Sequence, residues 1–182
     1  VVDPDPDTLA EYRRKAEARR RLERQLNRLR GLPAVTTDGA RIGLQANLEL
    51  PRDLDTALHG GAEGIGLLRT EFLFMNRPAL PSEDEQYASL RHVVETLDGR
   101  PVTIRTLDVG GEKLATALGE RIAESANPAL GLRAIRLALK EPKLLETQLS
   151  AILRAGAHGP VRILLPMISS VSQVRAVRSI LA

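Results

Sequence analysis

The stretch "VTIRTLDVGGEK", residues 102–113, reads first as a buried β-strand and then as a glycine-rich loop. Its strand portion, residues 102–107, is rich in apolar and β-branched residues, but it carries Arg105 near its end. Burying a guanidinium without a partner costs several kcal/mol, so an arginine at this position needs an anion or a carboxylate. The stretch therefore predicts a strand of a buried sheet whose C-terminal end presents a cation.

Three similar apolar runs predict three more strands, and a helical pattern follows each of the four. Ser82 with Glu85 three residues later predicts a capped helix start, and Pro142 predicts a break within a longer helical stretch. The chain therefore repeats a β-α unit four times. The other strands are expected at residues 41–49, 64–72 and 161–168, and the helices at residues 52–59, 81–97, 128–155 and 170–182.

Nearly continuous apolarity along each strand is typical of a parallel sheet that is covered on both faces. Two architectures satisfy this pattern, a doubly wound open sheet and a (β/α)8 barrel. The glycines of "GGAEGIG", residues 60–66, do not fit the G-x-G-x-x-G pattern of dinucleotide binding, and no P-loop pattern occurs. Four βα units make half a barrel, and a whole barrel typically takes about 250 residues. Since the chain has 182 residues and no initiating Met, we expect a fragment.

A separate basic helix is predicted at residues 8–30. Asp7 or Thr8 is expected to cap it, Glu11 to complete a capping box, and Gly31 to end it. This segment holds nine Lys or Arg and three Glu, whereas the rest of the chain has 17 basic and 20 acidic residues. We interpret the segment as a solvated linker or arm with one narrow packing stripe. A nucleic-acid-binding helix and a contact with another chain or domain are the alternatives.

The composition excludes several classes of protein. Hydrophobic residues make up 43% of the chain and charged residues 27%, as in an ordinary globular protein. No apolar run approaches the roughly 18 to 20 residues of a membrane span, and the acidic N-terminus has no signal-peptide pattern. There is no cysteine, and an aromatic content of 2% argues against a base-stacking nucleic-acid module. We expect a cytoplasmic protein that binds neither membranes nor nucleic acid.

Two arginines stand near the C-terminal ends of neighbouring predicted strands. These are Arg69 and Arg105, and in parallel α/β folds the chemistry lies at that end of the sheet. Strands about 4.8 Å apart would let both guanidiniums converge on one small phosphate or carboxylate, each with bidentate hydrogen bonds. The backbone of the following "GGEK" and Lys113 could face the same anion. The alternative is that the arginines form internal ion pairs, with Glu71 and Asp108 as candidates.

Other polar residues carry weaker signals. Arg133 reads by pattern as a structural arginine of a helix. The three histidines are isolated in the sequence, and we interpret each as a surface or satisfied residue: His59, His92 and His158. No cluster has the spacing of metal ligands, and no Ser-His-Asp arrangement can be argued, so no catalytic or metal-ligating residue is predicted.

Four motifs, in order, resemble the phosphoenolpyruvate-binding barrel of phosphoenolpyruvate–protein phosphotransferases, enzyme I of the bacterial phosphotransferase system. They are "GAEGIGLLRTEFLFMNRPALPSEDEQ" at 61–86, "IRTLDVGGEK" at 104–113, "NPALGLRAIR" at 127–136 and "ILLPMISSV" at 163–171. The basic helix is similar to the linker that precedes this barrel. The resemblance implies a helical linker at residues 1–33, followed at residues 34–182 by the N-terminal half of a (β/α)8 TIM barrel.

By the same resemblance, Arg69 and Arg105 hold phosphoenolpyruvate. Arg133 supports its phosphate, and Lys113 is a weaker candidate. The family transfers the phosphoryl group to a histidine on a separate domain, with Mg²⁺ bridging, and then to a phosphocarrier protein. A homodimer is implied for the full-length protein, which serves sugar transport or a nitrogen-regulatory cascade.

The chain departs from the family in what it lacks. The acceptor histidine of the family lies before the linker, the magnesium carboxylates lie beyond Ala182, and the family's C-terminal cysteine is absent. We therefore expect this segment alone not to complete phosphoryl transfer. The alternative is a non-catalytic interaction or dimerisation module that uses the basic helix and an open sheet edge. A third possibility, an aldolase- or lyase-like barrel, has no identifiable Schiff-base lysine or metal site.

Overall fold

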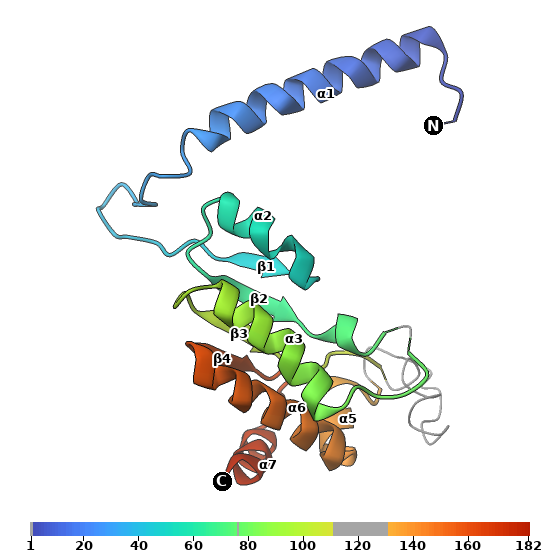
Figure 1. Ribbon diagram of the computed structural model, residues 1–182, viewed down its shortest axis with the longest axis vertical. Coiled ribbons are helices and arrows are strands. Elements are labelled where there is room, and N and C mark those ends of the chain that lie inside the picture. The colour runs from blue at the N-terminus through green and yellow to red at the C-terminus, as the bar shows by residue number, and fades with distance from the viewer. Residues whose placement is uncertain (1, 76, 111–130) are drawn as a thin grey trace.

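A four-stranded parallel sheet forms the centre of the computed structural model, which describes residues 2–75, 77–110 and 131–182 (Figure 1). The strands lie in chain order, so each one pairs with the strand that precedes it. All four predicted strands are present and parallel, but each is shorter than predicted. They are β1 (Ala46–Leu48), β2 (Ile65–Arg69), β3 (Val102–Arg105) and β4 (Val161–Leu164).

A helix follows each strand, which confirms the predicted β-α repeat and the α/β class. The α-helices of the described residues are α1 (Pro6–Asn27), α2 (Leu54–His59), α3 (Glu83–Thr96), α5 (Ala134–Lys140), α6 (Pro142–Ala155) and α7 (Val171–Leu181). Short 3-10 turns are η1 (Pro51–Asp53), η2 (Glu71–Leu73) and η4 (Gly156–His158).

The largest hydrophobic core lies between the sheet and three helices that cover the same face, α2, α3 and α6 (Figure 1). Strand residues and helix residues interdigitate there with almost no exposure to solvent. Burial of this apolar surface is the main force that holds the helices on the sheet. The core consists of Leu48, Leu54, Ile65, Leu68, Leu90, Val93, Val94, Leu97, Val102, Ile104, Ala151, Ile152 and Ala155.

The opposite face of the sheet is not covered by the part of the chain that the structure describes. In β3 the fully buried Val102 and Ile104 alternate with the half-buried Thr103 and Arg105. In β4, Leu164 is 38% exposed. The prediction of strands buried on both faces is therefore wrong for the described residues. Their apolar runs were overestimated, because they include turn residues beyond the strand ends.

Local signals correctly placed the start of α3 and the break between α5 and α6. Ser82 and Glu85 form the predicted capping box of α3, with Ser82 Oγ accepting from Glu85 N at 3.2 Å and Glu85 Oε2 accepting from Ser82 N at 2.8 Å. A second capping box, with Ser170 and Gln173, begins α7. The predicted break at Pro142 separates α5 from α6, because a proline fits the first position of a helix but not its interior.

The basic helix α1 begins earlier than predicted. Asp5 is its N-cap and accepts hydrogen bonds from Thr8 N and Thr8 Oγ1, both at 2.8 Å, while Pro6 takes the first helical position. The bond from Thr8 N holds the pKa of Asp5 below its usual value. The predicted cap at Asp7 or Thr8, with a box to Glu11, is thus wrong. No residue of α1 is buried, and the helix points away from the sheet (Figure 1).

Among the described residues, no helix combines the length and the apolarity that crossing a membrane requires.

Candidate functional site

Arg69 and Arg105 lie side by side at the C-terminal ends of β2 and β3. Their Cα atoms are paired in the parallel ladder, so both side chains leave the same face at the same end of the sheet. On the other side, Leu164 of β4 is the Cα partner of Arg105. The two predicted arginines are therefore brought together, on the face that the helices leave open.

An irregularity in β2 produces this alignment. Ile65 pairs with Val102 and Leu68 with Ile104, so three steps along β2 match two steps along β3. This β-bulge lies at Gly66 and Leu67, and it lets both Ile65 and Leu68 face the helices. With strict alternation from Ile65, Arg69 would also point at the helices. The bulge turns its guanidinium to the open face instead.

Each of the three described candidate arginines contacts a carboxylate. Arg105 Nη2 donates to Glu71 Oε1 at 2.8 Å, and Arg105 Nη1 lies 3.3 Å from Asp108 Oδ2. The ion pairs predicted as the alternative to anion binding, with Glu71 and Asp108, are thus present. Asp108 also accepts from Arg133, through Nη2 at 2.8 Å and Nε at 3.2 Å. Arg69 pairs with Glu49, which follows β1.

Burial differs along this row of charges. The side chains of Glu71 and Asp108 are each 15% exposed and that of Arg105 is 20% exposed, whereas Glu49 is 70% exposed. An exposed pair such as Arg69 with Glu49 contributes only about 0 to 1 kcal/mol, so Arg69 can change partners at low cost. The pairs around Arg105 are shielded from water and fix its position more firmly.

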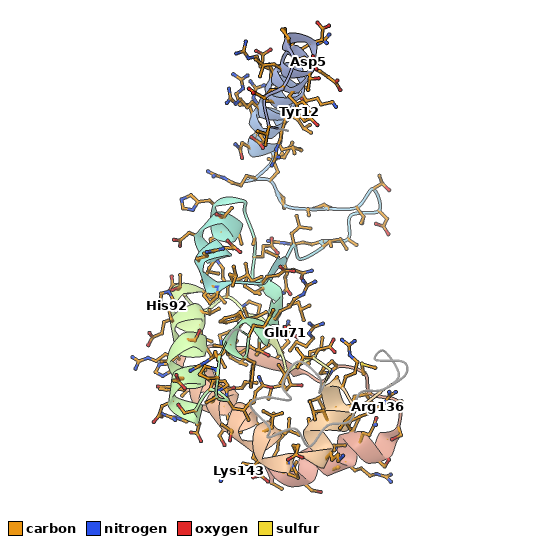
Figure 2. The ribbon with its side chains drawn as sticks, turned by 90° about the vertical axis from the view of Figure 1, so that its right-hand side faces the viewer. Asp5, Tyr12, Glu71, His92, Arg136 and Lys143 are labelled. Atoms are coloured by element: carbon orange, nitrogen blue, oxygen red, sulfur yellow. The ribbon has the colours of Figure 1, made fainter. Side chains whose placement is uncertain are left out.

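Glu71, which Figure 2 labels, connects the turn after β2 with the loop after β3 through its hydrogen bonds. Its Oε1 accepts both from Arg105 Nη2 and from Asp108 N at 3.1 Å. Its other oxygen, Oε2, and Arg105 Nε are buried without a hydrogen-bond partner in the described part of the chain. Buried polar atoms are nearly always paired, so these two atoms retain unused bonding capacity at the centre of the site.

The sequence pattern suggested that Arg133 lies within a helix, but it lies just before α5. It is the extended N-cap residue of α5 and forms an antiparallel bridge with Gly110. The next residue, Ala134, is buried and has a φ of +50°, which is strained for a residue with a side chain. This backbone geometry brings Arg133 to Asp108 and so to the same cluster as Arg105.

Lys113 and most of the "GGEK" loop lie outside the described residues. Glu49 is the partner that sequence reasoning missed. It lies directly after β1 at the same end of the sheet as Arg69. That position is the signal that could have found it, but the predicted first strand was too long to show where its end lies.

In the described residues, the side-chain hydrogen bonds and ion pairs of the histidines involve none of the three candidate arginines. His158 Nε2 is 2.9 Å from Tyr87 Oη, and its Nδ1 is 3.3 Å from Glu95. His59 Nδ1 is 2.7 Å from the backbone oxygen of Asp55, and His92 lies on α3 (Figure 2). Within residues 2–75, 77–110 and 131–182, no group of three or more potential ligands could hold a metal ion.

The arrangement is suited to binding a small anion with several acceptor oxygens. Arg69 is the ladder partner of Arg105, and Arg105 shares Asp108 with Arg133. Guanidiniums bind phosphate and carboxylate through paired hydrogen bonds. Three carboxylates contact these guanidiniums. An anion would replace some of these partners and reach arginines that are already in place.

Comparison with known proteins gives a family and named relatives. Residues 23–182 match the family model described as "PEP-utilising enzyme, PEP-binding domain". The chain is 49% identical over 183 residues to a phosphoenolpyruvate-protein phosphotransferase of Cupriavidus necator. It is 41% and 42% identical over 181 residues to proteins of the same name from Staphylococcus epidermidis and Geobacillus stearothermophilus. Each match covers 100% of this chain and 31% of the relative.

Proposed function

Because the chain belongs to the PEP-binding domain family of PEP-utilising enzymes, we propose that it forms the substrate-binding part of a phosphoenolpyruvate–protein phosphotransferase. The observation that carries the proposal is the pairing of Arg69 with Arg105 at the C-terminal ends of adjacent parallel strands. The chain spans 31% of the length of its relatives, so the activity of the whole protein is part of the proposal.

In this proposal, Arg69 and Arg105 bind phosphoenolpyruvate, and Arg133 supports its phosphate. Lys113 remains a weaker candidate. The bond between phosphorus and the enol oxygen breaks, the phosphoryl group passes to a histidine nitrogen on a separate domain, and the enolate of pyruvate is left to take up a proton. Guanidiniums offset the negative charge that is spread over the transferring group. The phosphohistidine then donates to a phosphocarrier protein.

Mg²⁺ is implied by the resemblance, but the described residues do not fit it. The three carboxylates near the arginines are each engaged by a guanidinium, and they do not form a ligand group. We therefore assign the metal ligands to other parts of the protein and derive no step through the ion. When bound, Mg²⁺ would offset phosphate charge together with the arginines.

The uncovered face of the sheet supports the proposal of a (β/α)8 barrel. In the part of the chain that the structure describes, helices cover one face of the sheet, as on the outside of a barrel, and four βα units correspond to half of a barrel's eight. We place this half-barrel at residues 34–182 and a helical linker at residues 1–33. The homodimer and the cytoplasmic location remain predictions of the same kind. The relatives do not favour the alternative of a non-catalytic interaction module.

The test is a calorimetric titration of phosphoenolpyruvate into the full-length protein that contains this chain. We expect Arg105→Ala and Arg69→Ala each to weaken binding about tenfold or more, because a charge-assisted hydrogen bond contributes about 1.5 to 3 kcal/mol. The matched control is Arg91→Ala, which removes a surface arginine of α3 that pairs with Glu95.

Equal affinity of all three variants and the unmodified protein would refute the assigned roles of Arg69 and Arg105. Absence of binding by the unmodified protein would refute the proposed function itself.

A further inference from the structure

One buried side chain from α6 joins the ends of β2 and β3. Gln148 is 2% exposed and reaches the sheet at the point where the two arginines emerge. Its Oε1 accepts a hydrogen bond from Leu107 N at 2.8 Å, and its Nε2 donates to Thr70 Oγ1 at 3.1 Å. Both ends of the amide are therefore in use, each on a different strand end.

Thr70 extends this connection to the backbone of Arg105. Its side chain has no exposure to solvent, and its Oγ1 donates to the backbone oxygen of Arg105 at 2.9 Å. The hydroxyl accepts from Gln148 and donates to Arg105, so the direction of both hydrogen bonds is fixed. A continuous chain of bonds thus runs from α6 through Thr70 to the strand residue that carries the guanidinium.

These bonds replace a backbone ladder that stops at the arginines. The pairing of β2 with β3 ends at Arg69 and Arg105, because Thr70 adopts helical backbone angles and the chain enters η2. The backbone oxygen of Arg105 and the N–H of Leu107 bond to side chains at this point, to the hydroxyl of Thr70 and the amide of Gln148. Buried backbone groups require such partners.

The anchored residues adjoin the charged groups of the candidate site. Thr70 lies between Arg69 and Glu71, and Leu107 directly precedes Asp108. We propose that Gln148 is a positioning residue of the anion site, which sets the spacing between the β2 turn and the β3 loop without touching the ligand. This inference rests on the proposed function, since it assigns Gln148 a role in binding phosphoenolpyruvate.

Compared with methionine and an ionised glutamate, only glutamine makes both of these hydrogen bonds. A methionine of similar length neither donates nor accepts a comparable hydrogen bond, and an ionised glutamate could accept from Leu107 N but could not donate to Thr70. Methionine therefore breaks both links between α6 and the strand ends, and ionised glutamate breaks the link to Thr70, whereas packing volume changes little.

The experiment measures phosphoenolpyruvate affinity and thermal stability for Gln148→Met in the full-length protein, with Gln86→Met as the matched control. Gln86 is 1% exposed on α3 and donates to the backbone oxygen of Pro81 at 3.2 Å, so it is a buried glutamine that does not contact the arginine cluster. We expect both variants to lower the melting temperature, but only Gln148→Met to raise the dissociation constant, by about ten- to a hundredfold.

A second pair of variants keeps the proposal testable if Gln148→Met does not fold. Thr70→Ser retains the hydroxyl and is expected to bind phosphoenolpyruvate as the unmodified protein does. Thr70→Val removes the hydroxyl at nearly constant shape, and we expect the same loss of affinity as for Gln148→Met.

Equal affinities for Gln148→Met and Gln86→Met, or for Thr70→Val and Thr70→Ser, would overturn the inference and leave the proposed function intact. Failure of the unmodified protein to bind phosphoenolpyruvate would instead overturn the proposed function, and with it this inference.

Discussion

At the scale of single residues, the charges of the site are paired within the protein. Its three guanidiniums contact three carboxylates, those of Glu49, Glu71 and Asp108. An anion that binds must therefore displace carboxylates from the guanidiniums. Its affinity reflects the difference between the hydrogen bonds that it forms and those that it replaces. The exposed Arg69 is the easiest of the three to release, and the enclosed Arg105 is the hardest.

Asp108 is the residue on which this balance depends most. It contacts both Arg105 and Arg133, and its side chain is only 15% exposed. Asp108→Asn keeps the shape but removes the charge that two half-buried guanidiniums share. We expect the free energy of unfolding to fall by about 1 to 3 kcal/mol, measured by urea denaturation of the full-length protein.

The control for this prediction is Asp84→Asn. Asp84 also pairs with an arginine, Arg154, but its side chain is 85% exposed, so its removal should change stability little. Similar losses in the two variants would show that burial of Asp108 does not matter.

The candidate arginines could be located from the sequence, whereas their supports could not. Arg69 and Arg105 follow apolar runs, and the ends of parallel strands meet at one edge, so their proximity required no side-chain detail. Gln148 lies more than forty positions from Leu107 and more than seventy from Thr70. The role of Gln148 depends on how α6 packs against the sheet, and no local sequence pattern predicts this packing.

At the scale of elements, two boundaries set by local chemistry were predicted correctly, although the local cap of α1 at Asp5 was not. The strand ends set by contacts between segments were not predicted. The capping box of α3 and the break at Pro142 each depend on residues within one turn. The end of β2 depends on Thr70 turning its hydroxyl to β3, so the predicted strand continued beyond the real one.

The capping box of α3 should make stability depend on pH. The backbone N–H of Ser82, followed by Arg77, holds the pKa of Glu85 below its ordinary value of 4.5. A lowered folded-state pKa means that the stabilisation is fully present above about pH 4.5 and is lost as the pH falls through the lowered pKa. We expect Glu85→Gln to have a lower urea midpoint than the unmodified protein at neutral pH, and the two midpoints to converge in acid.

Glu146→Gln, an exposed substitution on α6, serves as the control and should show no such convergence. A difference between Glu85→Gln and the unmodified protein that stays constant from neutral to acidic pH would contradict the assignment.

At the scale of the whole molecule, the sheet is asymmetric. Its α2, α3 and α6 face is tightly packed, while Thr103 and Leu164 on the other face remain accessible. The sequence predicted the parallel sheet because each strand and helix alternates along the chain. The sequence could not predict the open face. An apolar run indicates that a strand is buried in the complete fold, but it does not indicate which segment covers the strand.

A substitution at Leu164 tests whether other segments of the full-length protein cover this face of the sheet. Leu164 is 38% exposed here, and in a closed barrel it would lie in the packed interior. We expect Leu164→Ala to lower the free energy of unfolding of the full-length protein by about 2 to 5 kcal/mol, as for a buried leucine. Chemical denaturation measures this directly.

Leu153→Ala is the matched control, since Leu153 is 56% exposed on the outer surface of α6 and should matter little. If the two alanine variants lost equally little stability, the half-barrel would not be closed by the rest of the protein.

The bulge in β2 decides which face of the sheet Arg69 occupies. It absorbs one residue between Ile65 and Leu68; at the present length, pairing without the bulge would turn Arg69 toward the leucines of the helical layer. With one residue fewer, β2 would alternate regularly, as β3 does, and Arg69 would still lie on the open face. A single-codon deletion at the bulge would therefore straighten the strand without moving the arginine to the wrong side.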